Sequence, residues 1–66
     1  MAFELYDHVR IENKDVTGEI IDIYTGKDSK TYYIVESDKW GPVDDPDAFG
    51  DEWPQYDCTE DEITKI

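Results

Sequence analysis

The segment 44–53, Asp-Asp-Pro-Asp-Ala-Phe-Gly-Asp-Glu-Trp, gathers carboxylates of the kind that bind metal ions. A calcium ion needs six to eight oxygen ligands, and an EF-hand supplies them at fixed spacings. A register that begins at Asp45 places Asp47 correctly at the third position. The same register puts Phe49 at the fifth position and Tyr56 at the twelfth, where oxygen ligands are required. We therefore predict no metal site and no cofactor, and only an irregular, weak calcium site stays open.

The same region interleaves acids with aromatic rings, a pattern that favours protein recognition. Aromatic side chains are typical anchors of binding sites. We predict these partner-binding residues: Trp40, Asp45, Asp47, Phe49 and Trp53. Two alternatives stay open. The rings can instead fold back over the core while the acids stay solvated, because a small core needs aromatic cover. The carboxylates can also imitate a nucleic acid and occupy a DNA- or RNA-binding protein.

Side chains for catalysis are few. His8 is the only imidazole and Cys58 is the only thiol, so the chain lacks the ligands of a zinc site. No Ser, His and Asp stand in an order and spacing typical of a catalytic triad, and no glycine-rich loop is present to hold phosphates. The acids beside Cys58 raise the pKa of its thiol, and we predict a buried, unreactive side chain. The sequence therefore predicts that this protein is not an enzyme.

The charge of the chain limits the classes of partner that it can bind. Its 66 residues include 18 acidic and 6 basic side chains, for a formal net charge of −12. Residues 1–36 hold four cations and eight anions, and residues 37–66 hold two and ten. Direct nucleic-acid binding needs clustered cations, which are absent. No apolar run approaches the roughly 20 residues of a spanning helix, and residues 1–5 do not resemble a signal peptide. We expect a cytoplasmic protein with a protein partner and no membrane contact, and self-association stays open.

Alternating apolar and polar residues predict β-strands in the first half of the chain. The first strand is expected over residues 3–12 and the second over residues 16–24. Ile20 and Ile21 are adjacent and break the alternation of the second strand, which predicts either a bulge near Ile21–Asp22 or partial cover of both faces. A polar loop at residues 25–30 is short enough to close a hairpin.

The second half of the chain predicts two more strands and a helical turn. A strand over 31–36 and a short strand over 55–58 flank a loop at 37–55 that contains all three prolines. Thr59 and Glu62 have the spacing of a capping box at the start of a helical turn. Ile63 and Ile66 would then share one face of this turn.

Three stretches carry a family resemblance: Asp-His-Val-Arg-Ile at 7–11, Val-Thr-Gly-Glu-Ile-Ile-Asp-Ile-Tyr at 16–24 and Thr-Tyr-Tyr-Ile-Val-Glu at 31–36. They resemble the start of SH3-like barrels of the KOW-like kind, including small bacterial proteins of unknown function. Gly18 matches the glycine at which such a chain bends sharply. The resemblance covers residues 7–36, under half of the chain. It implies contacts with RNA or with ribosomal and transcription machinery, and the acidic balance of this chain argues against that implication.

Together these features predict one all-β domain over residues 1–66. The expected fold is a small SH3-like barrel of about five short antiparallel strands, with the long acidic loop 37–55 and a C-terminal helical turn. Closure of the barrel would remove exposed strand edges. The predicted core consists of Val9, Ile11, Ile20, Ile23, Tyr33, Val35, Cys58 and Ile63. We expect the fold to support a non-catalytic binding or accessory module.

Overall fold

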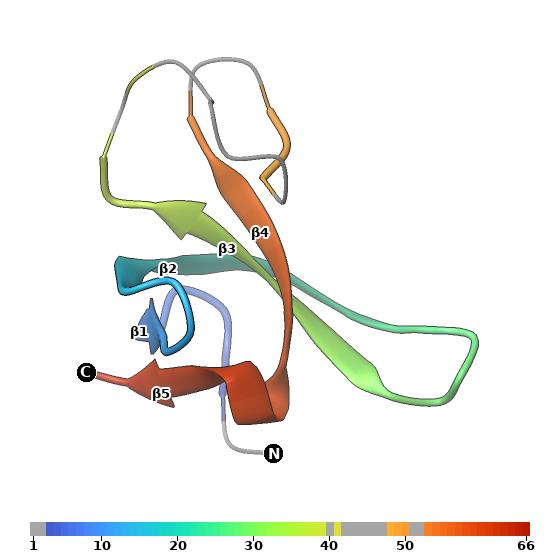
Figure 1. Cartoon of the computed structure of the whole chain (residues 1–66). Coiled ribbons are helices and arrows are strands. Elements are labelled where there is room, and N and C mark those ends of the chain that lie inside the picture. The colour runs from blue at the N-terminus through green and yellow to red at the C-terminus, as the bar shows by residue number, and fades with distance from the viewer. Residues whose placement is uncertain (1–2, 40, 42–47, 51–52) are drawn as a thin grey trace.

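The computed structural model describes residues 3–39, 41, 48–50 and 53–66. These residues form five strands and one 3-10 turn (Figure 1): β1 His8–Ile11, β2 Val16–Thr25, β3 Thr31–Ser37, β4 Gln55–Thr59, η1 Glu60–Glu62 and β5 Ile63–Lys65. All strand pairs are antiparallel and belong to one sheet. The prediction of an all-β fold is therefore confirmed.

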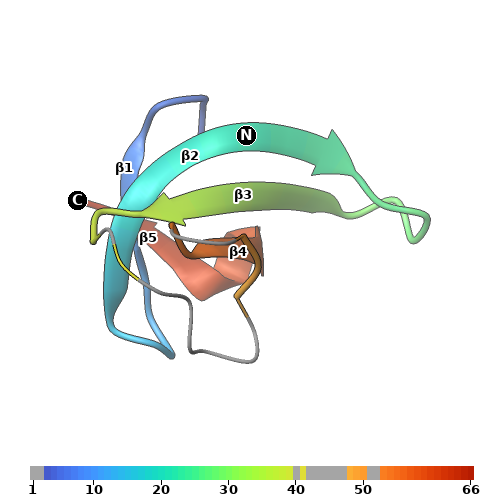
Figure 2. The same cartoon turned by 90° about the horizontal axis from the view of Figure 1, so that it is seen from above.

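The sheet has the strand order β4-β3-β2-β1-β5 and is strongly curved. Figure 2 shows β2 arching around the molecule. β3 pairs with β2 from Gly18 to Thr25, and β1 pairs with Val16–Glu19 on its other side. The predicted closed barrel is wrong, because β4 and β5 are the two edges of the sheet and do not pair within the described residues. Between them η1 is a 3-10 turn, not a hairpin turn. It redirects the chain so that β5 meets β1 instead of β4.

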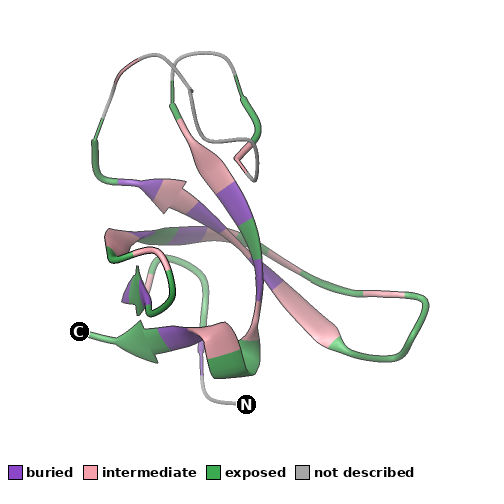
Figure 3. Cartoon of the chain, viewed as in Figure 1, coloured by how far each residue is buried: buried purple, intermediate pink, exposed green. Residues whose placement is uncertain are grey.

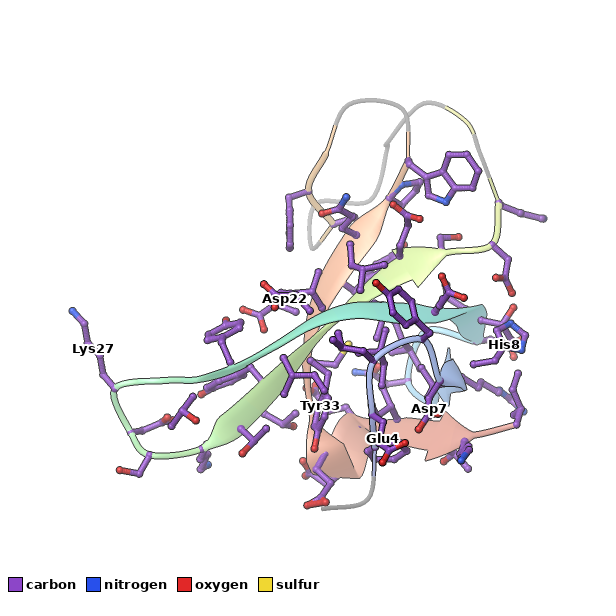
Figure 4. All side chains as sticks on the ribbon, turned by 180° about the vertical axis from the view of Figure 1, so that it is seen from behind. Glu4, Asp7, His8, Asp22, Lys27 and Tyr33 are labelled. Atoms are coloured by element: carbon purple, nitrogen blue, oxygen red, sulfur yellow. The ribbon has the colours of Figure 1, made fainter. Side chains whose placement is uncertain are left out.

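The predicted bulge in β2 is confirmed. Ile20 pairs with Val35 and Asp22 pairs with Ile34, which leaves Ile21 as an extra residue. One extra residue reverses the alternation of side chains along the strand. Ile20 and Ile23 can therefore both face the core. Beyond the bulge, β2 and β3 continue as a hairpin that projects from the rest of the molecule (Figure 1). Lys27 lies at its tip (Figure 4).

The core lies against the concave side of the sheet, and Figure 3 shows its buried positions alternating along β3 and β4. Seven of the eight predicted core residues are buried, and the eighth, Ile23, is half-buried and packs against them. Phe3 and Tyr56 are buried as well. The thiol of Cys58 is only 3% exposed, and its burial raises its pKa to about 12, as expected for an unreactive side chain.

The N-terminal part of the predicted first strand is wrong. β1 begins at His8, and residues 4–7 form a turn in which the Asp7 N–H donates to the Glu4 carbonyl at 3.2 Å. The Asp7 carboxylate accepts the Glu4 N–H at 2.9 Å (Figure 4). Tyr6 has a positive φ of 70° in this turn. These local hydrogen bonds compete with strand pairing and leave Leu5 47% exposed.

The C-terminal helical turn is present, but it is short. The Thr59 N–H donates to Glu62 Oε1 at 2.7 Å, as the predicted capping box requires. The turn then ends, and Ile63 begins β5 with extended backbone. The expected helical face is wrong, because Ile63 is buried beside Ile11 while Ile66 is 58% exposed.

Candidate recognition site

The connection between β3 and β4 carries the predicted partner-binding aromatics. Phe49 and Gln55 exchange two backbone hydrogen bonds of 2.9 Å, which add one bridge at the first residue of β4. Gly50 follows with a φ of 103°, a conformation that favours glycine. A Cβ at Gly50 would also lie 2.7 Å from the Trp53 carbonyl oxygen. The chain therefore turns tightly after Phe49 and holds this residue beside β4.

Trp53 is fixed at one end of its ring. Its indole N–H donates to the carbonyl oxygen of Ser37 at the end of β3. The Ser37 N–H in turn donates to the Pro54 carbonyl at 2.9 Å. The Trp53 side chain nevertheless remains 38% exposed, and Phe49 remains 45% exposed. Two aromatic residues are therefore held at the same end of the sheet with part of their surface open to solvent.

Of the five predicted site residues, Phe49 and Trp53 are described. Trp40, Asp45 and Asp47 lie outside the described residues. The structure accordingly places the two described aromatic anchors on the short segments that lead into β4.

A shallow hollow of about 210 Å³ adjoins this end of the sheet. It is lined by Asp15, Val16, Thr17, Ser37, Asp38 and Lys39. Ser37 lines the hollow and also accepts the hydrogen bond from Trp53, so the hollow lies next to Trp53. Pockets for small ligands usually start near 300 Å³. The hollow is therefore better suited to one side chain of a partner than to a whole ligand.

A polar cluster borders the hollow and ties three segments together. Asp38 Oδ2 lies 2.7 Å from His8 Nε2 and accepts the Thr17 hydroxyl at 2.8 Å. The Asp38 N–H donates to the Thr17 carbonyl at 3.0 Å. The hydrogen bond from His8, and then that from Thr17, lowers the pKa of Asp38 below its ordinary value. Because the Thr17 hydroxyl donates to the Asp38 carboxylate, the cluster ties the chain after β3 to β2.

We expect Asp38→Asn to lower the melting temperature by about 2–4 °C at neutral pH, because it removes the charge from a half-exposed cluster. The pKa of Asp38 is lowered by folding, so its stabilisation is present above the ordinary carboxyl pKa and is lost as the pH falls through the lowered value. Thermal melts followed by circular dichroism should therefore show a difference in melting temperature between the native protein and Asp38→Asn at pH 7, and this difference should narrow as the pH falls below the ordinary carboxyl pKa. A difference that does not change with pH would contradict this role, and Glu12→Gln is the control.

The sequence did not reveal this cluster. His8 is half-exposed, as its place in the alternation of β1 implies. Its partner Asp38 is 30 residues away, however, and the two meet only because β1 and β3 flank β2 in a particular register. Polar residues directly after a strand were the one available signal.

Within the described residues, no group of three or more His, Cys, Asp or Glu side chains is arranged to hold a metal ion. In the same part of the chain, no helix is long and apolar enough to cross a bilayer. Comparison of the chain with protein-family models, with curated proteins and with solved structures finds no match.

Proposed function

We propose that this chain is a non-catalytic binding module that recognises a protein partner through the connection between β3 and β4. One observation carries the proposal: Trp53 is fixed through its indole N–H group while the residue stays 38% exposed. A partner that binds such a ring does not have to order it first, which lowers the entropic cost of association. Phe49 is the second anchor, and Trp40, Asp45 and Asp47 remain predicted contacts.

We also propose that the sheet is an open variant of an SH3-like barrel in a cytoplasmic protein. Three features support the fold: β1 lies between β2 and β5, the sheet curves strongly along β2, and a 3-10 turn joins the last two strands. The single buried thiol supports a reducing compartment. Barrels of this kind carry many unrelated functions, so the proposed function depends on Trp53 and its surroundings and not on the fold.

The test compares Trp53→Ala with Tyr6→Ala, which removes an aromatic ring that is 68% exposed on another part of the surface. Each variant serves as bait in a host lysate, and captured proteins are quantified by mass spectrometry. We expect Trp53→Ala to reduce capture of the main partner at least about ten-fold, as for a central anchor. We expect the melting temperature to fall by less than about 3 °C.

Two outcomes would overturn the proposal. If Trp53→Ala lowers the melting temperature strongly and leaves capture unchanged, the ring only covers the end of the core. If the captured proteins bind DNA or RNA and are released steeply by added salt, the acidic nucleic-acid mimic is the better explanation, because exposed ion pairs are screened.

A further inference from the structure

The outer face of β2, β3 and β4 is a second surface with a distinct composition. Nine side chains point outward there in three cross-strand rows: Glu19–Glu36–Gln55, Asp22–Ile34–Asp57 and Tyr24–Tyr32–Thr59. The inward positions between these rows belong to the core, among them Tyr33 and Val35. We call these nine residues the outer face.

One end of the outer face is an aromatic platform. The rings of Tyr24 and Tyr32 stack with centroids 5.4 Å apart and planes inclined by 21°. The Tyr24 hydroxyl donates to Asp57 Oδ2 at 2.6 Å, and the Tyr32 hydroxyl donates to Asp28 Oδ2 at 2.7 Å. The hydrogen bond to Asp57 raises the pKa of Tyr24 to about 12. Both rings are thus held by their hydroxyl ends, and Tyr24 remains 40% exposed.

The rest of the outer face is negatively charged. It contains four carboxylates and no basic residue. Glu19 and Glu36 are directly opposite each other across β2 and β3, an arrangement in which like charges are destabilising. His8, Arg10 and Lys65 form their ion pairs with carboxylates outside this face, which are Asp38, Asp15 and Asp7. His8 pairs with Glu19 in the strand register, yet its side chain bonds Asp38.

We propose that the outer face binds an extended, lysine- and arginine-rich segment of a partner protein. Charge complementarity selects this occupant, since a cation between Glu19 and Glu36 would relieve their repulsion. A second cation can lie on the exposed ring of Tyr24, which attracts cations through its π face. Ile34, half-buried between Asp22 and Asp57, offers an apolar contact to the aliphatic part of a lysine or arginine side chain. This face does not include Phe49 or Trp53, so the inference stands apart from the proposed function.

The test uses a fluorescent oligolysine peptide, with binding followed by anisotropy at low salt. The double variant Glu19→Gln/Glu36→Gln should weaken binding about four-fold, at roughly two-fold for each exposed charge. The matched control, Glu12→Gln/Glu60→Gln, removes the same net charge from two exposed positions outside the outer face. We expect this control to weaken binding by less than about two-fold, since distant exposed charges are screened. Equal weakening by the two pairs would overturn the proposal, because the peptide would then follow only the net charge.

Two further variants keep the test specific. Tyr24→Leu keeps an apolar side chain but removes the π face, and we expect about two-fold to five-fold weaker binding. Trp53→Ala should leave the affinity for oligolysine unchanged. If Trp53→Ala abolishes binding, the peptide lies on the connection between β3 and β4, and the assignment to the outer face is wrong. Thermal melts confirm that each variant is folded before its affinity is compared.

Discussion

Gly18→Ala should destabilise this protein by about 3 kcal/mol, a large part of the roughly 3–10 kcal/mol expected for a domain of 66 residues. Gly18 is buried in β2, where it pairs with Val9 on one side and with Ser37 on the other. A Cβ at this position would lie 2.8 Å from the Glu36 carbonyl carbon and 2.9 Å from Val35 Cγ1, and it would overlap the Glu36 carbonyl oxygen. The neighbouring groups are backbone and core, so they cannot move aside cheaply.

Urea unfolding of Gly18→Ala and of the native protein measures this effect. The control is Thr25→Ala, an exposed substitution at the end of the same strand, which should cost less than about 1 kcal/mol. A Gly18→Ala variant as stable as Thr25→Ala would contradict this prediction, because it would show that β2 and β3 can move apart at Gly18 without loss of stability. The contacts of the added Cβ also explain why a glycine stands here. The neighbouring strand approaches too closely to leave room for a side chain, and no sharp bend of the chain is needed to explain it.

Tyr33→Ala should cost about 4 kcal/mol, because it removes the largest fully buried side chain of the core and leaves a cavity. Tyr33 lies at the centre of β3, paired with Ile23 and Cys58. Its ring packs edge-on against Phe3 with centroids 5.4 Å apart. At the melting temperature of so small a domain, this loss corresponds to a fall of well over 10 °C, and the variant is expected to be partly unfolded at 37 °C.

Tyr6→Ala is the matched control, since it makes the same substitution at a side chain that is 68% exposed. Its effect should stay within about 0.5 kcal/mol. Tyr33→Phe keeps the ring and tests whether packing or the hydroxyl group provides the stability. Differential scanning calorimetry of the three variants answers both questions. Similar melting temperatures for Tyr33→Ala and Tyr6→Ala would mean that the core does not depend on this ring.

The long strands were predictable because their signals are local. β2 is rich in isoleucine and β3 contains the run Thr-Tyr-Tyr-Ile-Val-Glu, so each has the composition of a strand on its own. Two adjacent isoleucines left a bulge or partial cover of both faces as alternatives, and the register shows the bulge. β5 was not predictable, because Ile63–Lys65 becomes a strand only where η1 brings it beside β1. The prediction of a strand at Leu5 failed for the opposite reason. The residues around it alternate as in a strand, but a turn closed by Asp7 forms there instead.

The candidate sites show the same limit. Because aromatic residues interleave with acids, the sequence made Phe49 and Trp53 candidates for partner binding, and both are exposed near the start of β4. The pairing of His8 with Asp38 depends on strand register, which residue types do not specify. The outer face could not be predicted either, because each of its rows joins residues from three strands. In addition, Glu19 and Asp22 lie on the same side of the sheet only because the bulge adds Ile21 between them.

The bulge and the edge strands also bear on the solubility of the protein. Beyond Ile20, β2 pairs only with β3 within the described residues, so its other backbone edge is open along the projecting hairpin. Within the described residues, β5 and the part of β4 that follows the Phe49–Gln55 bridge add two more open edges. Exposed edges are templates for strand-by-strand aggregation, and natural proteins protect them with charge. A second copy that approaches any of these edges brings another net charge of −12 with it. The acidity of the chain thus protects a sheet that never closes on itself.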